Sequence, residues 1–425
     1  MKRTYSNTSA RLILLFTLLL TIGFTSCNQN KMDAANQTIK AGTWRVALQH
    51  ADGVEIPFIM EAETRNDSTI LYLINGEERI LVDEISTVGD SVKIRLHIFD
   101  ADLIAKVDDG KMAGRFVRND LSYPYSVPFT AELGNTNRFK ADPAAANFNY
   151  DGKWEVVFTD TTGSSYKAVG VFEQDNNKVT GTFLTETGDY RYLEGQVDGN
   201  QLNLSTFDGN HAYLFTATPV DENTLKGNFY SGMNYTETWT AKRNANAALA
   251  DANTLTFLKP DYEKLDFTFP DIDGNGNISL SDEKYKGKVV IVQLLGSWCP
   301  NCMDETKFLA PYYDKNKDRG LEIIGLGFER SPEFEKAAPR LQKMKDRMNV
   351  NYDLTVAGIS DKEAAAKALP ALNHVLSFPT TIYIGRDGKV RKIHTGFSGP
   401  GTGKYYEDWV ADFNKTMDQL LAEKI

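Results

Sequence analysis

The feature that most constrains the fold is an internal repeat between residues 42 and 243. Apolar and polar residues alternate there in short runs, with turn residues at about every 8 to 12 positions, which is typical of antiparallel sheet. Four motifs return at offsets between 108 and 113 residues. The pairs are Gly42–Val46 with Gly152–Val156, Ile98–Asp100 with Thr206–Asp208, Met112–Phe116 with Leu225–Phe229, and Phe129–Ala131 with Trp239–Ala241. Two copies of one all-β unit are therefore predicted.

Each copy has room for about seven or eight strands, which suits a small antiparallel barrel or sandwich. A closed barrel leaves no exposed strand edge, and this favours the barrel. We expect the first unit at residues 41–133 and the second at residues 151–243. Two linkers, 134–150 and 244–256, are rich in Ala and Asn and separate the units from each other and from the remaining chain.

The remaining chain, residues 257–425, changes to strands that alternate with amphipathic helices. Val289–Leu295 is a continuous apolar run, as expected for a strand buried on both faces of a parallel or mixed sheet. Leu321–Leu326 and Thr380–Ile384 are similar runs, and apolar residues recur at helical spacing from Tyr405 to Leu420. The sequence therefore predicts a multidomain chain, all-β at first and α/β at its C-terminal end.

The first 26 residues have the architecture of a secretory signal peptide. Basic residues precede an apolar run of about 13 residues, Leu12–Phe24, whereas a membrane-spanning helix needs about 20. Thr25, Ser26 and Cys27 resemble the processing box of bacterial lipoproteins, which implies a lipidated Cys27 and a flexible tether over residues 27–40. We expect a lipid-anchored protein of the cell envelope that faces the periplasm, and an uncleaved anchor helix is the alternative.

Charge and cysteine content exclude two broad classes of protein. The chain has 47 Lys and Arg against 57 Asp and Glu, so it has no overall positive field that would attract nucleic acid. It has three cysteines, at positions 27, 299 and 302, which are too few for a disulfide-stabilised scaffold of 425 residues. The last two cysteines therefore need their own explanation.

The motif Trp298–Cys302 follows the apolar run Val289–Leu295 and precedes a helical pattern. At the first turn of a helix, unpaired N–H groups and the helix dipole stabilise an anion, which favours the thiolate of Cys299 over the thiol. Pro300 suits the first helical position because its ring fixes φ there. The two-residue spacer brings Cys302 close enough to attack a mixed disulfide on Cys299. A redox-active dithiol is predicted.

Metal sites and a structural disulfide are the competing interpretations. Zinc needs two further ligands, and this part of the chain adds only His374 and His394, without the usual close pairing. A structural disulfide between the two cysteines would close a very short loop and add little stability. Asp271–Asp282 fits a calcium loop, but its flanks look like strands, so we expect a β-hairpin there. We predict no metal and no dissociable cofactor.

The Trp298–Cys302 motif and the later Phe378–Thr380 resemble the thioredoxin superfamily. The likeness covers residues 266–425 and is strongest to the extracytoplasmic, membrane-tethered thiol-disulfide oxidoreductases of the TlpA and ResA kind. The resemblance implies a thioredoxin-like fold in which Pro379 is cis and faces the dithiol. It also implies that Trp298 shields the pair, and that Pro300, Phe378 and Pro379 contribute to the substrate-binding surface.

Glu305 is the expected proton carrier. It lies three residues after Cys302, on the same helix face, and the resemblance to ResA implies a role in proton handling. Thioredoxin has a buried aspartate in the preceding strand, where this chain has Gln293, which cannot titrate. A solvated glutamate on the helix surface is the alternative interpretation.

The resemblance implies a membrane-anchored reductase of envelope proteins that acts through Cys299 and Cys302. Its substrates would be protein or peptide disulfides, and a membrane redox donor would supply the electrons. One alternative is a lipoprotein that binds a ligand or protein through the duplicated β region. Another is a thiol peroxidase, although Ser297–Cys299 lacks the usual Thr-x-x-Cys context.

Overall fold

The computed structural model describes residues 38–66 and 68–424. The expected signal peptide, Cys27 and the tether up to residue 37 lie outside the described residues. Within the described ranges, no helix has the length and apolar character needed to cross a membrane.

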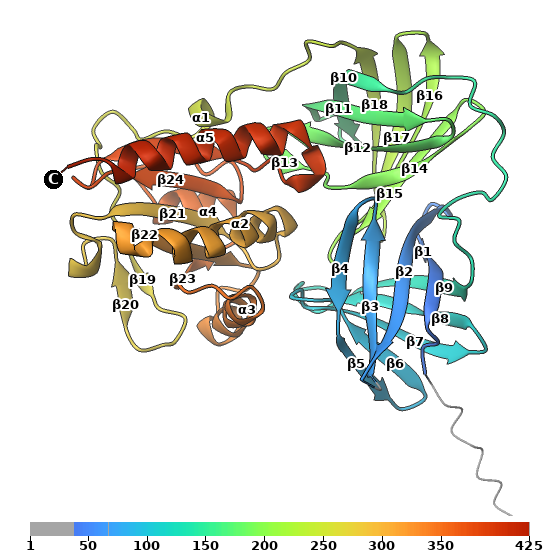
Figure 1. Ribbon diagram of the computed structural model, residues 1–425, viewed down its shortest axis with the longest axis horizontal. Helices are drawn as coiled ribbons and strands as arrows, with labels where there is room; N and C mark the ends of the chain where they lie inside the picture. Colours follow the sequence, from blue (N-terminus) through green and yellow to red (C-terminus); the bar gives the residue numbers. More distant parts are fainter. Residues whose placement is uncertain (1–37, 67, 425) are drawn as a thin grey trace, which may run out of the picture. The chain divides into compact units, whose positions relative to one another are not determined.

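The first β unit is a nine-stranded antiparallel meander (Figure 1, blue to cyan). Its order is β4-β3-β2-β1-β9-β8-β7-β6-β5, so the first and last strands pair with each other. The strands are β1 (Gly42–Gln49), β2 (Glu55–Arg65), β3 (Ser68–Asn75), β4 (Glu78–Val82), β5 (Glu84–Val88), β6 (Ser91–Arg95), β7 (Ala101–Asp108), β8 (Lys111–Arg118) and β9 (Tyr125–Leu133). One residue, Asp83, separates β4 from β5, which is why the unit has more strands than expected.

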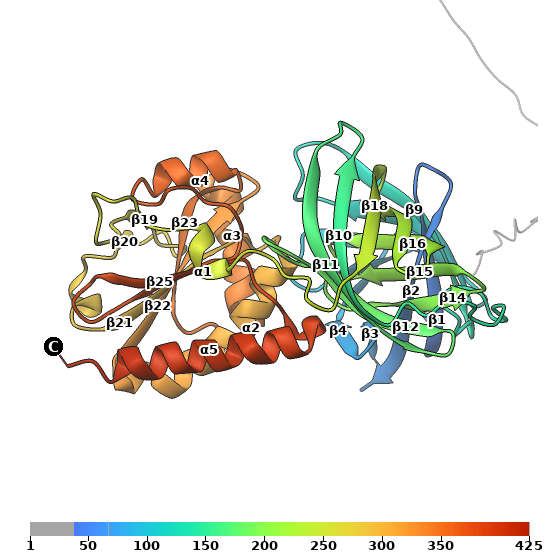
Figure 2. The same ribbon diagram turned by 90° about the horizontal axis from the view of Figure 1, so that it is seen from above.

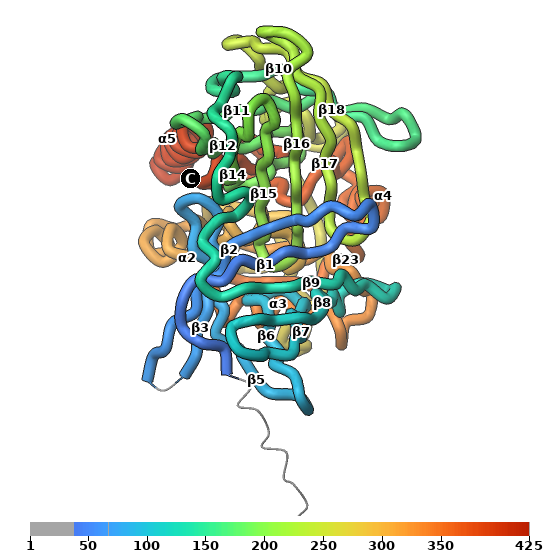
Figure 3. The backbone as a smooth tube through the Cα atoms, turned by 90° about the vertical axis from the view of Figure 1, so that its right-hand side faces the viewer, coloured from blue at the N-terminus to red at the C-terminus, as the bar shows by residue number. Residues whose placement is uncertain are grey.

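The second unit repeats this meander and closes on itself through an additional pairing of β11 with β12. Figure 3 traces both meanders. The strands are β10 (Gly152–Asp160), β11 (Ser165–Asp175), β12 (Lys178–Thr185), β13 (Gly188–Asp189), β14 (Leu193–Asp198), β15 (Gln201–Phe207), β16 (Ala212–Asp221), β17 (Thr224–Ser231) and β18 (Tyr235–Arg243). The two-residue β13 pairs with the end of β12 and forms a tight hairpin.

The same tryptophan contact occurs in both units. Trp44 and Trp154 are fully buried at equivalent places in β1 and β10. Each indole Nε1 donates to the carbonyl four residues earlier, Lys40 O at 3.0 Å and Tyr150 O at 2.9 Å. The predicted duplication and the barrel architecture are therefore confirmed.

The C-terminal domain is a mixed five-stranded sheet covered by helices, which confirms the predicted thioredoxin-like α/β fold. The sheet order is β23-β22-β21-β24-β25, with β21, β22 and β23 parallel and the other pairings antiparallel. Helices α2 and α5 cover one face and α3 and α4 the other (Figure 2). The elements are α1 (Ala252–Leu255), β19 (Thr268–Pro270), β20 (Asn277–Ser279), η1 (Glu283–Tyr285), β21 (Val289–Leu295), α2 (Pro300–Asn316), η2 (Lys317–Arg319), β22 (Leu321–Glu329), α3 (Phe334–Arg347), β23 (Asp353–Ile359), α4 (Lys362–Ala368), β24 (Thr380–Ile384), β25 (Val390–Thr395), η3 (Pro400–Thr402) and α5 (Lys404–Leu421).

Three predictions about this domain are confirmed. Every residue of β21 is buried, as its continuous apolar run indicates. Strands β19 and β20 form the hairpin expected over residues 271–282. The apolar stripe of α5 packs inward, with the Phe413 ring 4.9 Å from Phe308 of α2 and 5.9 Å from Tyr383 of β24. Buried β21 and the packing of α5 on α2 and β24 hold the junction between β21 and α2 in position.

Candidate active site

The two cysteines lie where the chain leaves β21 and enters α2. Cys299 is the N-cap of α2, and its Sγ accepts a hydrogen bond from the Cys302 backbone N–H at 3.3 Å, while Pro300 occupies the first helical turn. The Cys299 thiol donates to Phe378 O at 3.4 Å. The Cys299 sulfur therefore lies at the N-terminus of α2, within reach of an unpaired backbone N–H group. Both cysteines are free thiols, and Cys299 is 6% exposed while Cys302 is fully buried.

The peptide bond between Phe378 and Pro379 is cis, as the resemblance to thioredoxins implies. The Phe378 ring meets the Trp298 ring edge to face, with centroids 6.0 Å apart. The structure therefore brings the predicted substrate-binding residues together around Cys299.

Trp298 is held from three sides. Its indole Nε1 donates to Phe328 O at 2.9 Å, and the Arg330 guanidinium lies 4.0 Å above its ring. Its carbonyl accepts a hydrogen bond from Asn210 Nδ2 at 2.7 Å, and Asn210 comes from the second β unit. The side chain beside the dithiol is thus fixed by both the C-terminal domain and the β region.

Glu305 is fully buried, so the alternative of a solvated surface glutamate is wrong. Gln293 Nε2 donates to one carboxylate oxygen at 2.7 Å, and Thr381 Oγ1 donates to the other at 2.6 Å. These bonds lower the pKa of Glu305, but burial has the larger effect and raises it to about 7. The carboxyl group can therefore gain or lose a proton near neutral pH.

Cys302 is a buried thiol with a raised pKa. Burial raises the pKa of its thiol well above the usual value, and its hydrogen bond and charge interaction with Cys299, together with the charge of Glu305, add to this effect. Cys302 therefore keeps its proton near neutral pH.

Glu329, at the end of β22, is a fully buried carboxylate that the sequence analysis missed. It accepts hydrogen bonds from the Ser297 N–H at 2.7 Å and the Ser297 hydroxyl at 2.8 Å. Burial raises the pKa of Glu329. The two bonds fix the turn just before Trp298. A glutamate directly after the apolar run that ends β22 was the only signal in the sequence.

Residues of the second β unit also reach the site, and the sequence analysis missed these as well. Arg191 is buried and donates to the carboxylates of Glu78 and Asp304 and, at 3.3 Å, to Pro300 O. Asp189 Oδ2 accepts a hydrogen bond from the Gly399 N–H at 2.6 Å. No sequence signal identified these contacts, because the partners lie more than 100 positions apart.

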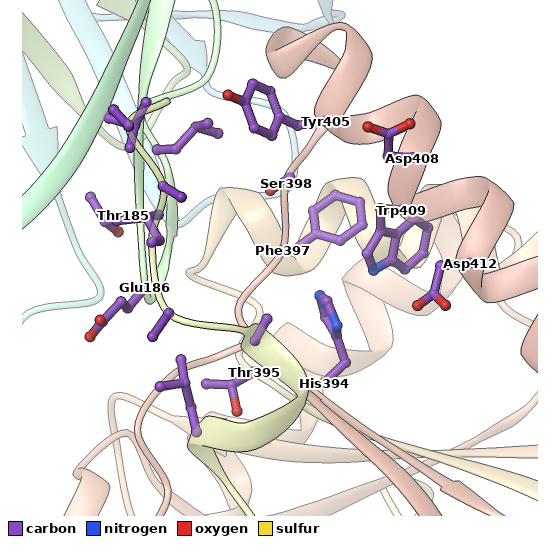
Figure 4. A pocket seen from close by; sticks show the side chains of 18 of the residues that line it. Thr185, Glu186, His394, Thr395, Phe397, Ser398, Tyr405, Asp408, Trp409 and Asp412 are labelled. Atoms are coloured by element: carbon purple, nitrogen blue, oxygen red, sulfur yellow. The ribbon is translucent and has the colours of Figure 1, made fainter. Parts of the chain in front are cut away.

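A cavity of about 360 Å³ lies beside this site, between the end of β12 and helix α5 (Figure 4). Its aromatic wall includes Phe397 and Trp409, whose rings meet edge to face 4.8 Å apart. His394 also lines it, and burial lowers the pKa of this imidazole to about 4. Among the described residues, no group of three or more His, Cys, Asp or Glu side chains is arranged to hold a metal ion.

Comparison with known proteins is consistent with this geometry. Residues 262–393 match the AhpC/TSA family. The thiol-disulfide oxidoreductase ResA of Halalkalibacterium halodurans is 25% identical over 134 residues, which cover 32% of this chain and 67% of ResA. ResA of Geobacillus kaustophilus is 32% identical over 132 residues, 31% of this chain and 66% of that protein. The matches thus span about two thirds of the length of these curated relatives.

Among solved structures, the thioredoxin domain of a thiol-disulfide oxidoreductase from Bacteroides vulgatus is 22% identical. The match covers 38% of this chain and 99% of that domain, with a TM-score of 0.26. The C-terminal part of this chain is an AhpC/TSA thioredoxin-like domain related to the ResA thiol-disulfide oxidoreductases.

Proposed function

We propose that this chain is a lipid-anchored, extracytoplasmic thiol-disulfide oxidoreductase that reduces disulfides of envelope proteins or peptides. The observation that carries the proposal is the position of the Cys299 sulfur. It caps α2, accepts the Cys302 N–H and lies 3.4 Å from the carbonyl that precedes the cis proline. The similarity to ResA supports the same activity.

In the first step, the Cys299 thiolate attacks one sulfur of a substrate disulfide. The substrate S–S bond breaks, a mixed disulfide forms with Cys299, and the second substrate sulfur leaves as a thiolate that takes up a proton. The helix N-terminus lowers the cost of holding the negative charge on Cys299 before the attack. Cys302 stays protonated at this stage because of its raised pKa.

In the second step, Glu305 accepts the proton of Cys302, and the new thiolate attacks the Cys299 sulfur. The mixed disulfide bond breaks, the Cys299–Cys302 disulfide forms, and the substrate sulfur leaves as a thiolate that takes up the proton from Glu305. The dithiol loses two electrons and the substrate disulfide gains them. Regeneration then requires two electrons from a dithiol-bearing redox partner, which we place in the membrane.

The proposed location follows from the N-terminal sequence. Cleavage before Cys27 and acylation of that residue would anchor the protein to the membrane through lipid. We therefore propose Cys27 as the lipidation site.

The test is to trap the first intermediate. With Cys302→Ala, the second step is blocked, so a mixed disulfide on Cys299 should accumulate and survive non-reducing gel electrophoresis. Mass spectrometry of the adduct then identifies the substrate. Cys299→Ala combined with Cys302→Ala is the matched control and should trap nothing. Equal adduct levels in both variants, or none in either, would refute the proposal.

A further inference from the structure

The reactive sulfur is covered by the chain itself. Cys299 is only 6% exposed, although a substrate disulfide must come within bonding distance of its Sγ. The cover comes from the second β unit. It consists of the segment Thr187–Arg191, which includes β13, and the turn Asp208–His211 between β15 and β16.

The segment Thr187–Arg191 contacts each of the three loops that surround the dithiol. Ser377 Oγ, next to the cis peptide bond, donates to Thr187 O at 2.6 Å. Asn301 Nδ2, between the two cysteines, lies 3.4 Å from Asp189 O. The Gly399 N–H donates to Asp189 Oδ2 at 2.6 Å. One short piece of chain therefore contacts all three loops.

Gly188 of this segment lies close to the Asn301 side chain. Gly188 has a φ of +149°, and a Cβ there would lie 2.4 Å from Asn301 Nδ2. A residue with a side chain would be strained at this φ and would have to push the Asn301 amide aside. Next to it, Asn210 Nδ2 donates to Trp298 O at 2.7 Å and covers the tryptophan side of the sulfur.

We infer that the three loops form a polypeptide-binding surface, that Thr187–Arg191 occupies it in cis, and that a substrate segment must displace Thr187–Arg191 to reach Cys299. This inference rests on the proposed function. The contacts also indicate what kind of substrate segment would bind. It would be extended, with backbone carbonyls that accept hydrogen bonds from Ser377 Oγ and Asn301 Nδ2. An acidic side chain on that segment would accept the Gly399 N–H, as Asp189 does.

The occupying segment cannot react with the dithiol. The chain has cysteines only at positions 27, 299 and 302, so Thr187–Arg191 contains no sulfur that Cys299 could attack. It can therefore fill the surface without being consumed, and only a substrate that carries a disulfide there completes the first step.

Displacing the segment changes both ion pairs and an aromatic contact. Arg191 is buried among the carboxylates of Glu78, Asp304 and Asp208. Burying such charges costs much of the free energy that their attraction provides, so these pairs add little net stability compared with the hydrated state. Thr187, at the other end of the segment, is already exposed. Displacement therefore exchanges buried ion pairs for hydrated ones, and it also has to move the Tyr190 ring from its contacts with Phe183 and Phe215 in the core of the second unit.

The test compares the full-length protein with a variant whose segment is loosened, Asp189→Asn combined with Arg191→Gln. Asp198→Asn is the matched control, because Asp198 lies on the same β unit but its carboxylate pairs with Lys140 of the linker between the β units. The measurement is the rate constant of each reduced protein with the disulfides of insulin. We expect the loosened variant to react at least about tenfold faster, because apparent affinity scales with the fraction of molecules whose binding surface is free.

A peptide with the sequence of residues 185–192 should inhibit the loosened variant competitively, whereas a scrambled peptide should not. If wild type and the loosened variant reduce insulin at equal rates, the inference is wrong and the proposed function stands. If no form of the protein reduces any disulfide, the proposed function fails and this inference fails with it.

A second measurement keeps the inference testable if the loosened variant does not fold. In the Cys302→Ala protein, backbone amides of residues 187–191 should exchange with deuterium at least about tenfold faster once a substrate peptide is attached to Cys299 as a mixed disulfide. Unchanged protection of these amides in the mixed disulfide would overturn the inference.

Discussion

At the scale of single residues, the polar group beneath the dithiol has the clearest chemical consequence. Gln293 and Thr381 donate to both oxygens of Glu305, and each bond favours the ionised carboxylate. Burial opposes ionisation more strongly than the two bonds support it, and the pKa of Glu305 is raised to about 7. Gln293 and Thr381 are neutral, so Glu305 is the member of this group of three that titrates near neutral pH.

Glu305→Gln should change how stability depends on pH. The folded-state pKa is raised, so the contribution of Glu305 to stability is complete below pH 4.5 and is lost as the pH rises towards about 7. This loss amounts to about 3 kcal/mol for the wild type. The free energy of unfolding can be measured with urea between about pH 4 and 8. It should depend less on pH in the variant than in the wild type. Parallel profiles for the two proteins would contradict this assignment.

The Arg330 guanidinium lies over the ring of Trp298, next to Cys299, and it should increase the reactivity of Cys299. The guanidinium lies 4.0 Å above Trp298, and its charge interacts with Cys299. Arg330→Gln should slow the alkylation of Cys299 by iodoacetamide at neutral pH about 3- to 10-fold, since one charge interaction of about 1 kcal/mol stabilises the thiolate. Arg347→Gln is the control, because Arg347 pairs with Asp83 and Glu84 instead. Equal rates for the two variants would show that Arg330 does not act on the thiolate.

At the scale of secondary-structure elements, the repeat is explained by close contacts inside each barrel. Gly114 of β8 and Gly227 of β17 occupy equivalent positions in the two copies. A Cβ on either residue would lie 2.1 Å from a carbonyl oxygen of the neighbouring strand, Ile104 O or Thr216 O. Each barrel therefore requires glycine where two strands come closest, and the motif around it recurs for that reason.

Gly227→Ala should destabilise the second β unit. The added methyl group meets Thr216 O at 2.1 Å and the indole of Trp239 at 2.5 Å, so the strands must move apart. Overpacking of this kind costs about 1–3 kcal/mol. Thermal unfolding followed by circular dichroism measures the loss. Lys226→Ala, on the exposed side of the same strand, is the control and should leave the midpoint unchanged.

Local patterns explain which elements and site residues could be predicted. The apolar run of β21, the cysteines at the start of α2 and the proline before β24 each depend on neighbours in sequence, so their positions were predictable. The cover over Cys299 was not. Arg191 pairs with Asp304 across 113 positions, and Asn210 reaches Trp298 across 88. Only the folded chain brings such partners together, and an isolated arginine or asparagine in a β-rich region gives no sign of it.

At the scale of the whole molecule, the two β units share a core. Phe207, the last residue of β15 in the second unit, is fully buried in the first unit. Its ring stacks on Phe58 at 4.2 Å and meets Phe116 edge to face at 5.3 Å. Asn75 of the first unit fixes the Phe207 backbone through two hydrogen bonds, at 2.9 Å and 3.1 Å. Since the turn that follows β15 carries Asn210 to Trp298, this shared core also supports the cover over the dithiol.

Phe207→Ala should therefore weaken the first unit even though the residue belongs to the second. Removing a buried phenylalanine costs about 3–5 kcal/mol. Hydrogen–deuterium exchange should become faster in β2 and β8, which carry Phe58 and Phe116, and Cys299 should react faster with iodoacetamide as Asn210 loses its support. Phe215→Ala is the matched control, because Phe215 is equally buried but packs in the core of its own unit. In that variant, exchange should increase in the second unit while β2 and β8 stay protected. If Phe207→Ala gave the same pattern as Phe215→Ala, the two units would not be coupled through this residue, and the cover would depend on other contacts.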